Sequence, residues 1–75
     1  MEMKSLSEKA VTVLDENYDW AKKFALAGKR DVAMSLYHGC AYNLEFMRCL
    51  ELISFKEYRK LMDKHHGLFD SIFGA

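Results

Sequence analysis

The chain has 75 residues, of which 51% are hydrophobic and 13% are aromatic, and it contains no proline. This length allows one domain, residues 1–75, with a modest core, so part of the apolar surface is expected to be covered by a partner. Eleven basic residues balance eleven acidic residues, and this neutrality argues against a generic nucleic-acid binder.

The first predicted helix covers residues 5–27. Ser5 and Glu8 have the spacing of a capping box, in which side chains satisfy the first backbone N–H groups. Gly28 follows the helix, where a left-handed backbone is common. The apolar positions recur with the period of a helix and form one stripe: Leu6, Ala10, Val13, Leu14, Tyr18, Ala21, Phe24 and Ala25.

The second predicted helix covers residues 31–52, with Asp31 as its N-cap. Its main apolar stripe contains Val32, Leu36, Gly39, Cys40, Met47 and Leu50. Further apolar residues flank that stripe: Met34, Ala41, Tyr42, Leu44, Phe46 and Leu52. A helix that is apolar over most of its circumference is normally central, so we expect this helix to be covered from more than one side.

The third predicted helix covers residues 55–72. Ser54 and Glu57 have capping-box spacing. One apolar face begins with Phe55, Tyr58, Leu61, Met62 and His65, and it continues in phase with Leu68, Phe69, Ile72 and Phe73. This continuity favours one helix through Gly67, because an internal glycine costs only about 1 kcal/mol. The alternative is a stop at Gly67 followed by a short docked tail.

Two asparagines stand within the apolar stripes of the first two helices. Folding the second helix back on the first places Asn17 opposite Asn43. An unpaired buried amide costs roughly 1–3 kcal/mol, so we expect these side chains to satisfy each other. Such a polar pair would set the register, as a buried asparagine does in coiled coils. The alternative is that they bind a ligand in a polar pocket.

The predicted fold is therefore all-α, a long antiparallel hairpin followed by a third helix. The third helix either closes a three-helix bundle or packs on another chain in a homodimer. The apolar flanks of the second helix and the aromatic C-terminal segment favour the dimer. Aromatic and methionine side chains are enriched at protein interfaces, and the predicted interface residues are Trp20, Met34, Tyr42, Phe46, Leu68, Phe69, Ile72 and Phe73.

The spacing of the cysteines and histidines does not indicate a catalytic site or a metal site. Cys40 and Cys49 would lie on opposite sides of a helix, with Cys40 in the core and Cys49 exposed. His65 and His66 are adjacent, whereas helical metal ligands are typically four residues apart. We therefore predict no catalytic residues, no metal and no cofactor, and His65 is expected to be a packed residue.

The expected location follows from the N-terminus and the cysteines. Residues 1–10 are charged and lack the apolar segment of a signal peptide. No apolar run approaches the ~20 residues that span a bilayer, so no membrane association is expected. Two cysteines without close pairing indicate a reducing compartment, and we expect a cytoplasmic protein.

One short segment resembles a known type of helical hairpin. Gly28, Ala33 and Tyr37 have the spacing seen in tetratricopeptide-like repeats, with Ala33 at the close-packing position. No second repeat follows, although such arrays normally contain several. The hairpin also resembles the first two helices of three-helix trafficking modules. Both resemblances concern helical hairpins, and neither transfers a functional residue.

The predicted function is a small non-enzymatic protein-interaction module, a regulator or inhibitor that binds another protein through an apolar and aromatic helical surface. Its size and neutral charge fit an accessory protein of a bacterium, phage or mobile element. The alternative is a nucleic-acid-associated regulator. Its basic face would comprise Lys56, Arg59, Lys60 and Lys64 on the third helix.

Overall fold

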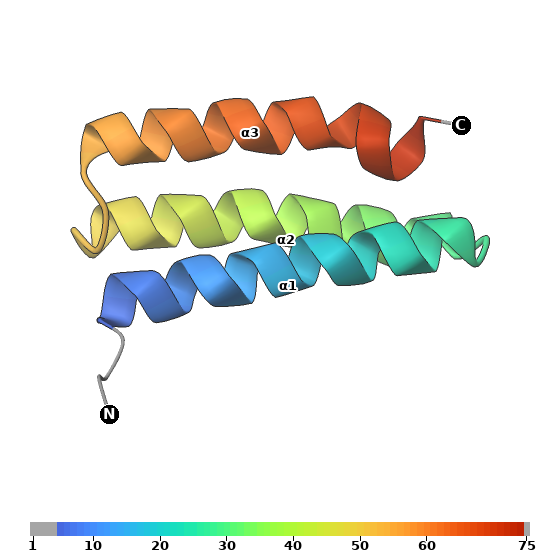
Figure 1. Cartoon of the computed structure of the whole chain (residues 1–75), viewed down its shortest axis with the longest axis horizontal. Coiled ribbons are helices and arrows are strands. Elements are labelled where there is room, and N and C mark those ends of the chain that lie inside the picture. The colour runs from blue at the N-terminus through green and yellow to red at the C-terminus, as the bar shows by residue number, and fades with distance from the viewer. Residues whose placement is uncertain (1–4, 75) are drawn as a thin grey trace.

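The computed structural model describes residues 5–74, which form three helices and no strand (Figure 1). Helix α1 covers Leu6–Leu26, α2 covers Arg30–Cys49 and α3 covers Phe55–Phe73. Helices α1 and α2 form the closest pair, an antiparallel hairpin, and α3 packs mainly on α2 and less on α1. The all-α prediction is confirmed, and the packing is that of a three-helix bundle.

The helix starts are fixed by the two predicted serines. The Ser5 hydroxyl accepts a hydrogen bond from the Glu8 N–H at 3.2 Å. Ser54 forms a complete capping box, since its hydroxyl accepts from the Glu57 N–H at 3.1 Å and its own N–H donates to the Glu57 carboxylate at 3.3 Å. Each cap satisfies N–H groups that have no partner within the helix.

Two similar C-terminal motifs end α1 and α2. Past α1, Gly28 adopts a φ of 82°, and the Lys29 N–H donates to the Phe24 carbonyl at 2.8 Å. Past α2, Glu51 adopts a φ of 58°, and the Leu52 N–H donates to the Met47 carbonyl at 2.9 Å. Both are Schellman motifs, in which a left-handed residue lets the chain reverse.

The predicted bounds of the second helix were wrong at both ends. It begins at Arg30 after Lys29, which forms no side-chain cap, so Asp31 lies in the first turn instead of at the N-cap. It ends at Cys49 because the left-handed Glu51 breaks the helix before residue 52. The predicted continuity of the third helix through Gly67 agrees with α3.

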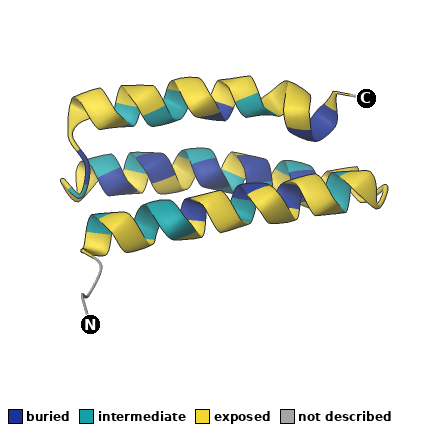
Figure 2. Ribbon diagram, in the orientation of Figure 1, coloured by how far each residue is buried: buried dark blue, intermediate teal, exposed yellow. Residues whose placement is uncertain are grey.

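The buried core uses one regularly spaced stripe of α2. Its residues alternate in steps of four and three: Ala33, Tyr37, Cys40, Leu44 and Met47. The other helices contribute Leu14, Tyr18, Ala21, His65, Ile72 and Phe73 (Figure 2). The predicted α2 stripe was therefore wrong at several positions. Val32 and Leu50 are exposed because the core side of α2 is rotated towards α3.

Among the helices of residues 5–74, none is both long enough and apolar enough to cross a membrane.

Candidate protein-interaction surface

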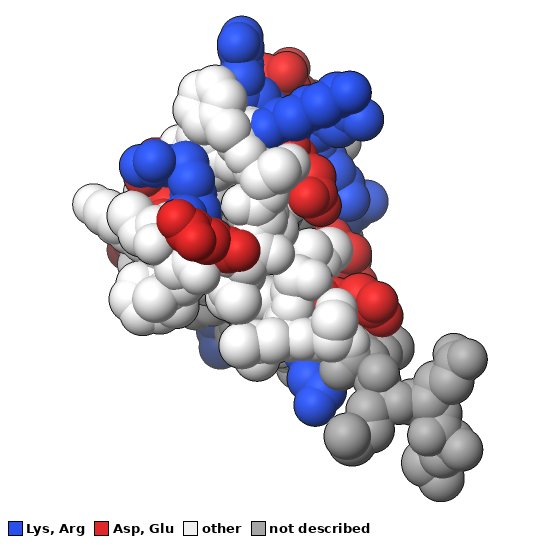
Figure 3. Space-filling model, turned by 90° about the vertical axis from the view of Figure 1, so that its left-hand side faces the viewer, with Lys and Arg blue, Asp and Glu red and all other residues white. Residues whose placement is uncertain are grey.

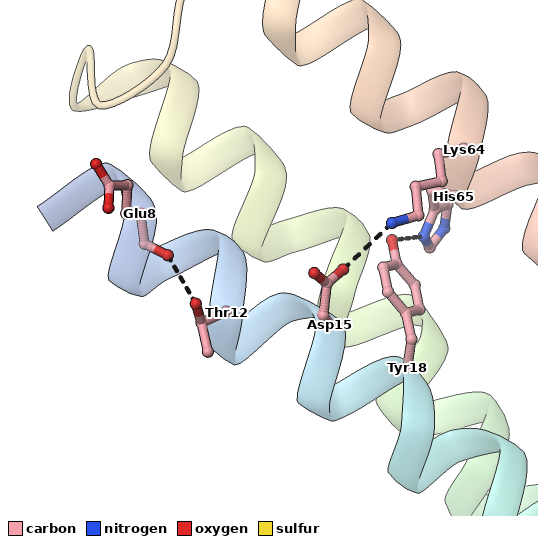
Figure 4. Close-up of polar contacts among 6 residues, drawn as sticks. All are labelled: Glu8, Thr12, Asp15, Tyr18, Lys64 and His65. Carbon is pink, nitrogen blue, oxygen red and sulfur yellow. Dashed lines mark hydrogen bonds and ion pairs between the residues drawn. The ribbon is translucent and has the colours of Figure 1, made fainter. Parts of the chain in front are cut away.

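A buried polar cluster lies on the side of the hairpin that α3 covers. The Tyr18 hydroxyl lies 2.6 Å from Nδ1 of His65 (Figure 4). The Tyr37 hydroxyl donates a 2.8 Å hydrogen bond to the main-chain carbonyl of His65, and the two rings stack with centroids 4.0 Å apart. His65 is only 3% exposed. Each helix contributes one residue, so the cluster joins α3 to both helices of the hairpin.

The protonation states of this cluster are those of neutral groups. Burial lowers the pKa of His65, and the neighbouring His66 and His38 lower it further. Burial is also the main cause that raises the pKa of the Tyr18 and Tyr37 hydroxyls. At neutral pH, therefore, the Tyr18 hydroxyl is hydrogen-bonded to a neutral imidazole. The cluster therefore joins the three helices through buried, neutral polar groups.

The two cysteines differ in exposure, as the sequence predicted. Cys40 is fully buried, and burial raises the pKa of its thiol to about 11. That thiol is protonated at neutral pH, whereas the thiolate is the nucleophile. Cys49 is exposed. Within residues 5–74, no three His, Cys, Asp or Glu side chains are grouped so that they could hold a metal ion.

Two further polar contacts connect α3 with the hairpin at its surface. The Tyr58 hydroxyl and Nη2 of Arg48 both donate to the Glu45 carboxylate. The bond from Tyr58 is the largest cause that lowers the pKa of Glu45. Nζ of Lys64 lies 3.3 Å from the Asp15 carboxylate (Figure 4). Exposed pairs of this kind contribute about 0–1 kcal/mol, so they orient α3 more than they hold it.

A groove between α2 and α3 lies beside the buried imidazole and has a volume of about 560 Å³. Its lining comprises Tyr37, His38, Ala41, Met62, His65, His66, Phe69 and Asp70. Among its polar side chains, His65 is buried and hydrogen-bonded, whereas His38, His66 and Asp70 are exposed.

The predicted interface residues divide into three groups. Trp20, Tyr42, Phe46 and Phe69 are exposed, with Tyr42 at 77% and Phe46 at 66%. Met34 and Leu68 are half-buried against the core. Ile72 and Phe73 are 6% and 5% exposed, so they are core residues of this chain.

The physical reason for the burial of Phe73 is its position at the end of α3. Its ring packs edge-on against Tyr37 with centroids 5.6 Å apart and lies 5.0 Å from Phe69. The Arg30 guanidinium lies 5.7 Å from the ring centre. The aromatic C-terminal segment therefore closes its own bundle, and the prediction that Ile72 and Phe73 face another chain does not describe this structure.

The predicted asparagine pair is not formed. Asn17 is half-buried, Asn43 is exposed, and no hydrogen bond joins their amides among the contacts of residues 5–74. The reason is the rotation of α2, which turns Asn43 out of the hairpin interior. Asn43 instead lines a groove beside Val13 and Phe46.

The two asparagines belong to a surface that we call the open face, the side of the hairpin turned away from α3. The contacts to α3 come from Asp15 and Tyr18 on α1 and from Tyr37 and Glu45 on α2. The open face lies on the opposite flank of each helix. Its α1 residues are Leu6, Ala10, Val13, Asn17, Trp20 and Phe24. Its α2 residues are Val32, Leu36, Gly39, Asn43, Phe46 and the C-cap Leu50.

None of these twelve residues is charged. Leu6, Trp20 and Phe46 are each more than half exposed, as are Val13 and Leu50. Towards the end where α1 begins and α2 ends, the face is hollowed into an apolar groove of about 370 Å³. Figure 3 views the molecule from that end and shows a large uncharged area, interrupted on its left-hand side by a group of acidic and basic side chains.

Leu6, Val13 and Leu50 are surface residues that the sequence reasoning assigned to the core stripes. The feature of the sequence that could have predicted their exposure is the presence of two adjacent apolar stripes on α2. One stripe passes through Ala33 and Tyr37, and the other passes through Val32 and Leu36. A single α3 covers only one of them.

The predicted basic face is exposed on α3. Lys56, Arg59, Lys60 and Lys64 all have exposed side chains. Lys64 is paired with Asp15. Acidic residues of the same helix, Glu57 and Asp63, interrupt the positive charge, and Figure 3 shows acidic side chains close to the basic ones at this end of the molecule.

Comparison with known proteins adds no relative: no protein-family model, curated protein or solved structure matches the chain significantly.

Proposed function

We propose that this chain is a non-enzymatic protein-interaction module, a small regulator or inhibitor whose open face binds another polypeptide. The observation that carries the proposal is the open face itself, a two-helix surface without a charged residue and with Phe46 66% exposed. Contiguous apolar patches on soluble proteins commonly mark binding sites. An apolar groove between two helices also suits an apolar helix face as its ligand.

The reactive side chains support the same proposal. The thiol of Cys40 has a pKa raised to about 11, and the imidazole of His65 is buried and hydrogen-bonded. Every buried side-chain nitrogen or oxygen in the described residues has a hydrogen-bond partner. A catalytic site needs polar groups that converge on a reacting atom. Here the buried polar side chains Tyr18, Tyr37 and His65 hold three helices together.

Photo-crosslinking tests this proposal. A benzophenone amino acid replaces Phe46 on the open face or Phe55 at the start of α3, which are 66% and 64% exposed. Full-length protein in the cells that produce it is irradiated, and covalent adducts are separated by mass. We expect protein adducts from position 46 and few from position 55. No adduct at either position, or equal adducts at both, would contradict a specific binding surface.

A second candidate function is association with nucleic acid through α3. The supporting observation is that Lys56, Arg59 and Lys60 are exposed and form no ion pair within residues 5–74. Binding would weaken steeply with salt because phosphate contacts release counterions. A mobility-shift assay with mixed-sequence DNA and RNA at low salt tests this candidate, and the absence of a shift would remove it.

A further inference from the structure

The open face has the spacing of a helix-packing seam. Its α1 members follow one another in steps of four and three residues, from Leu6 to Phe24, and its α2 members do the same from Val32 to Leu50. A repeat of 3.5 residues is typical of helices that pack knobs-into-holes against other helices. The core stripe of α2 has the same steps, from Ala33 to Met47. The exposed surface is therefore patterned like the buried one.

The open face is two helices wide, and this width favours a partner that also presents two helices. A single helix seated in the groove would cover Phe46 but leave residues outside the groove, such as Trp20 and Val32, in water. Two antiparallel helices with a matching pair of seams would cover the whole face, as in a four-helix bundle. The α1–α2 hairpin of a second copy supplies such a pair.

The two asparagines occupy equivalent places in the repeat. With Ala10 and Leu36 at heptad position a, Asn17 and Asn43 are also a residues, one on each helix. A lone asparagine at position a specifies register and oligomeric state in coiled coils. An amide carries both a donor and an acceptor, so when α1 of one copy lies against α2 of the other, Asn17 and Asn43 can satisfy each other between the copies.

The margins of the face are also compatible with a second copy. The positions that flank the seam on α1 are Lys9, Glu16 and Lys23. The equivalent positions on α2 are Ser35, Tyr42 and Cys49. When α1 of one copy lies against α2 of the other, charged residues meet uncharged ones, and like charges are not brought together.

The large apolar side chains alone offer more than half of the area that a standard interface buries per partner. Six large apolar side chains of the face are 44–66% exposed. At roughly 150 Å² for each side chain, they offer about 500 Å² of apolar surface. The half-buried members, which include Phe24 and Leu36, add to it. A standard interface buries about 800 Å² per partner.

We infer that the partner of the open face is a second copy of this chain. Two α1–α2 hairpins pack face to face into a four-helix core, and each α3 stays on the outer side of its own hairpin. The inference rests on the proposed function, because it names the polypeptide that the open face binds.

Light scattering across a dilution series of purified, tag-free protein tests the inference. We expect the wild type to have the mass of two chains at high concentration. Phe46→Glu should weaken dimerisation about 100-fold or more, since an unpaired charge buried at an interface costs several kcal/mol. Phe55→Glu is the matched control, with nearly equal exposure outside the face, and should leave the dimer unchanged.

Val13→Glu places the same charge on the α1 part of the open face. It tests whether both helices of the face contribute to dimerisation. Circular dichroism establishes that each variant is folded. A wild type that stays monomeric at every concentration would overturn the inference, as would a dimer that Phe46→Glu and Val13→Glu leave intact. The proposed function fails separately, when photo-crosslinking at position 46 yields no protein adduct. Adducts only with a different protein would retain that function and exclude the second copy.

Discussion

The two sides of the α1–α2 hairpin have the same helical spacing but are completed in different ways. On one side α3 supplies the cover, and specific polar contacts fix its position, including the 2.6 Å bond between Tyr18 and His65. On the other side the apolar stripes run the length of both helices, and the polar residues among them are two asparagines and no charges. Apolar periodicity therefore identifies packing surfaces, whereas polar contacts determine which surface the chain covers by itself.

The largest expected difference between the two sides concerns two leucines, one within α2 and one at its C-cap. Leu44 is fully buried, and Leu50 is 54% exposed on the open face. Leu44→Ala should lower the free energy of unfolding by about 2–5 kcal/mol, because it leaves a cavity. Leu50→Ala should change it by about 0.5 kcal/mol or less in dilute, monomeric protein. Urea denaturation at two protein concentrations measures both, and equal losses for the two variants would contradict the comparison.

A smaller effect is expected from removing one hydroxyl. Tyr18→Phe leaves the buried imidazole of His65 without its partner, which should cost about 1–3 kcal/mol. Tyr42→Phe removes a hydroxyl from a residue that is 77% exposed and should have almost no effect. Urea denaturation again provides the measurement. An unchanged stability for Tyr18→Phe would mean that the cluster does not hold α3.

The free energy of unfolding should also depend on pH, because of a titratable group on the α3 side of the hairpin. The pKa of His65 is lowered in the folded protein, mainly by burial, from an ordinary value of 6.5. The unfolded chain therefore binds more protons, so stability is complete above pH 6.5 and falls as the pH drops below that value. Tyr18, Tyr37, His38, His66 and Asp70 are the titratable side chains around the imidazole.

Urea denaturation between pH 7.5 and 5.5 measures this dependence. His65→Gln, which removes the titrating group, should flatten the decrease in the urea midpoint. His66→Gln alters an exposed neighbour and should retain most of the decrease. An equally steep decrease in His65→Gln would assign the pH dependence to other groups.

The smallest expected effect comes from a substitution at the end of α2 that alters neither the α3 side of the hairpin nor the open face. Glu51 has a φ of 58° in the motif that ends α2, where a side chain is strained and glycine is not. Glu51→Gly should raise the free energy of unfolding by about 1 kcal/mol, because a left-handed residue other than glycine costs about 1–2 kcal/mol. Thermal denaturation measures the shift, and a loss of stability would show that Glu51 has a compensating contact.

The parts of the fold that could be predicted are those that depend on local chemistry. The Ser54 cap, the turn at Gly28 and the continuity of α3 through Gly67 all follow from short-range patterns. The early end of α2 at Cys49 could not be predicted, because the apolar pattern continues to Leu52. A left-handed glutamate gives no signal in the sequence.

The candidate surface was predicted only in part, because periodicity gives the direction of an apolar stripe and not the identity of its cover. Of the predicted interface residues, Trp20, Tyr42 and Phe46 are exposed, whereas Ile72 and Phe73 are buried. The contact between Tyr18 and His65 joins residues 47 positions apart. Such a contact depends on how α3 lies across the hairpin, and neither residue shows this in its local sequence.

The sequence separation of that contact also has a consequence for synthesis. The ribosome completes the open face at Leu50, before it has added His65 or the residues that bury Tyr37. Helical hairpins with local contacts form faster than contacts between distant residues. A newly made chain therefore presents two apolar sides until α3 emerges. One of these sides is covered only after residues 55–73 have been synthesised and have packed on the hairpin.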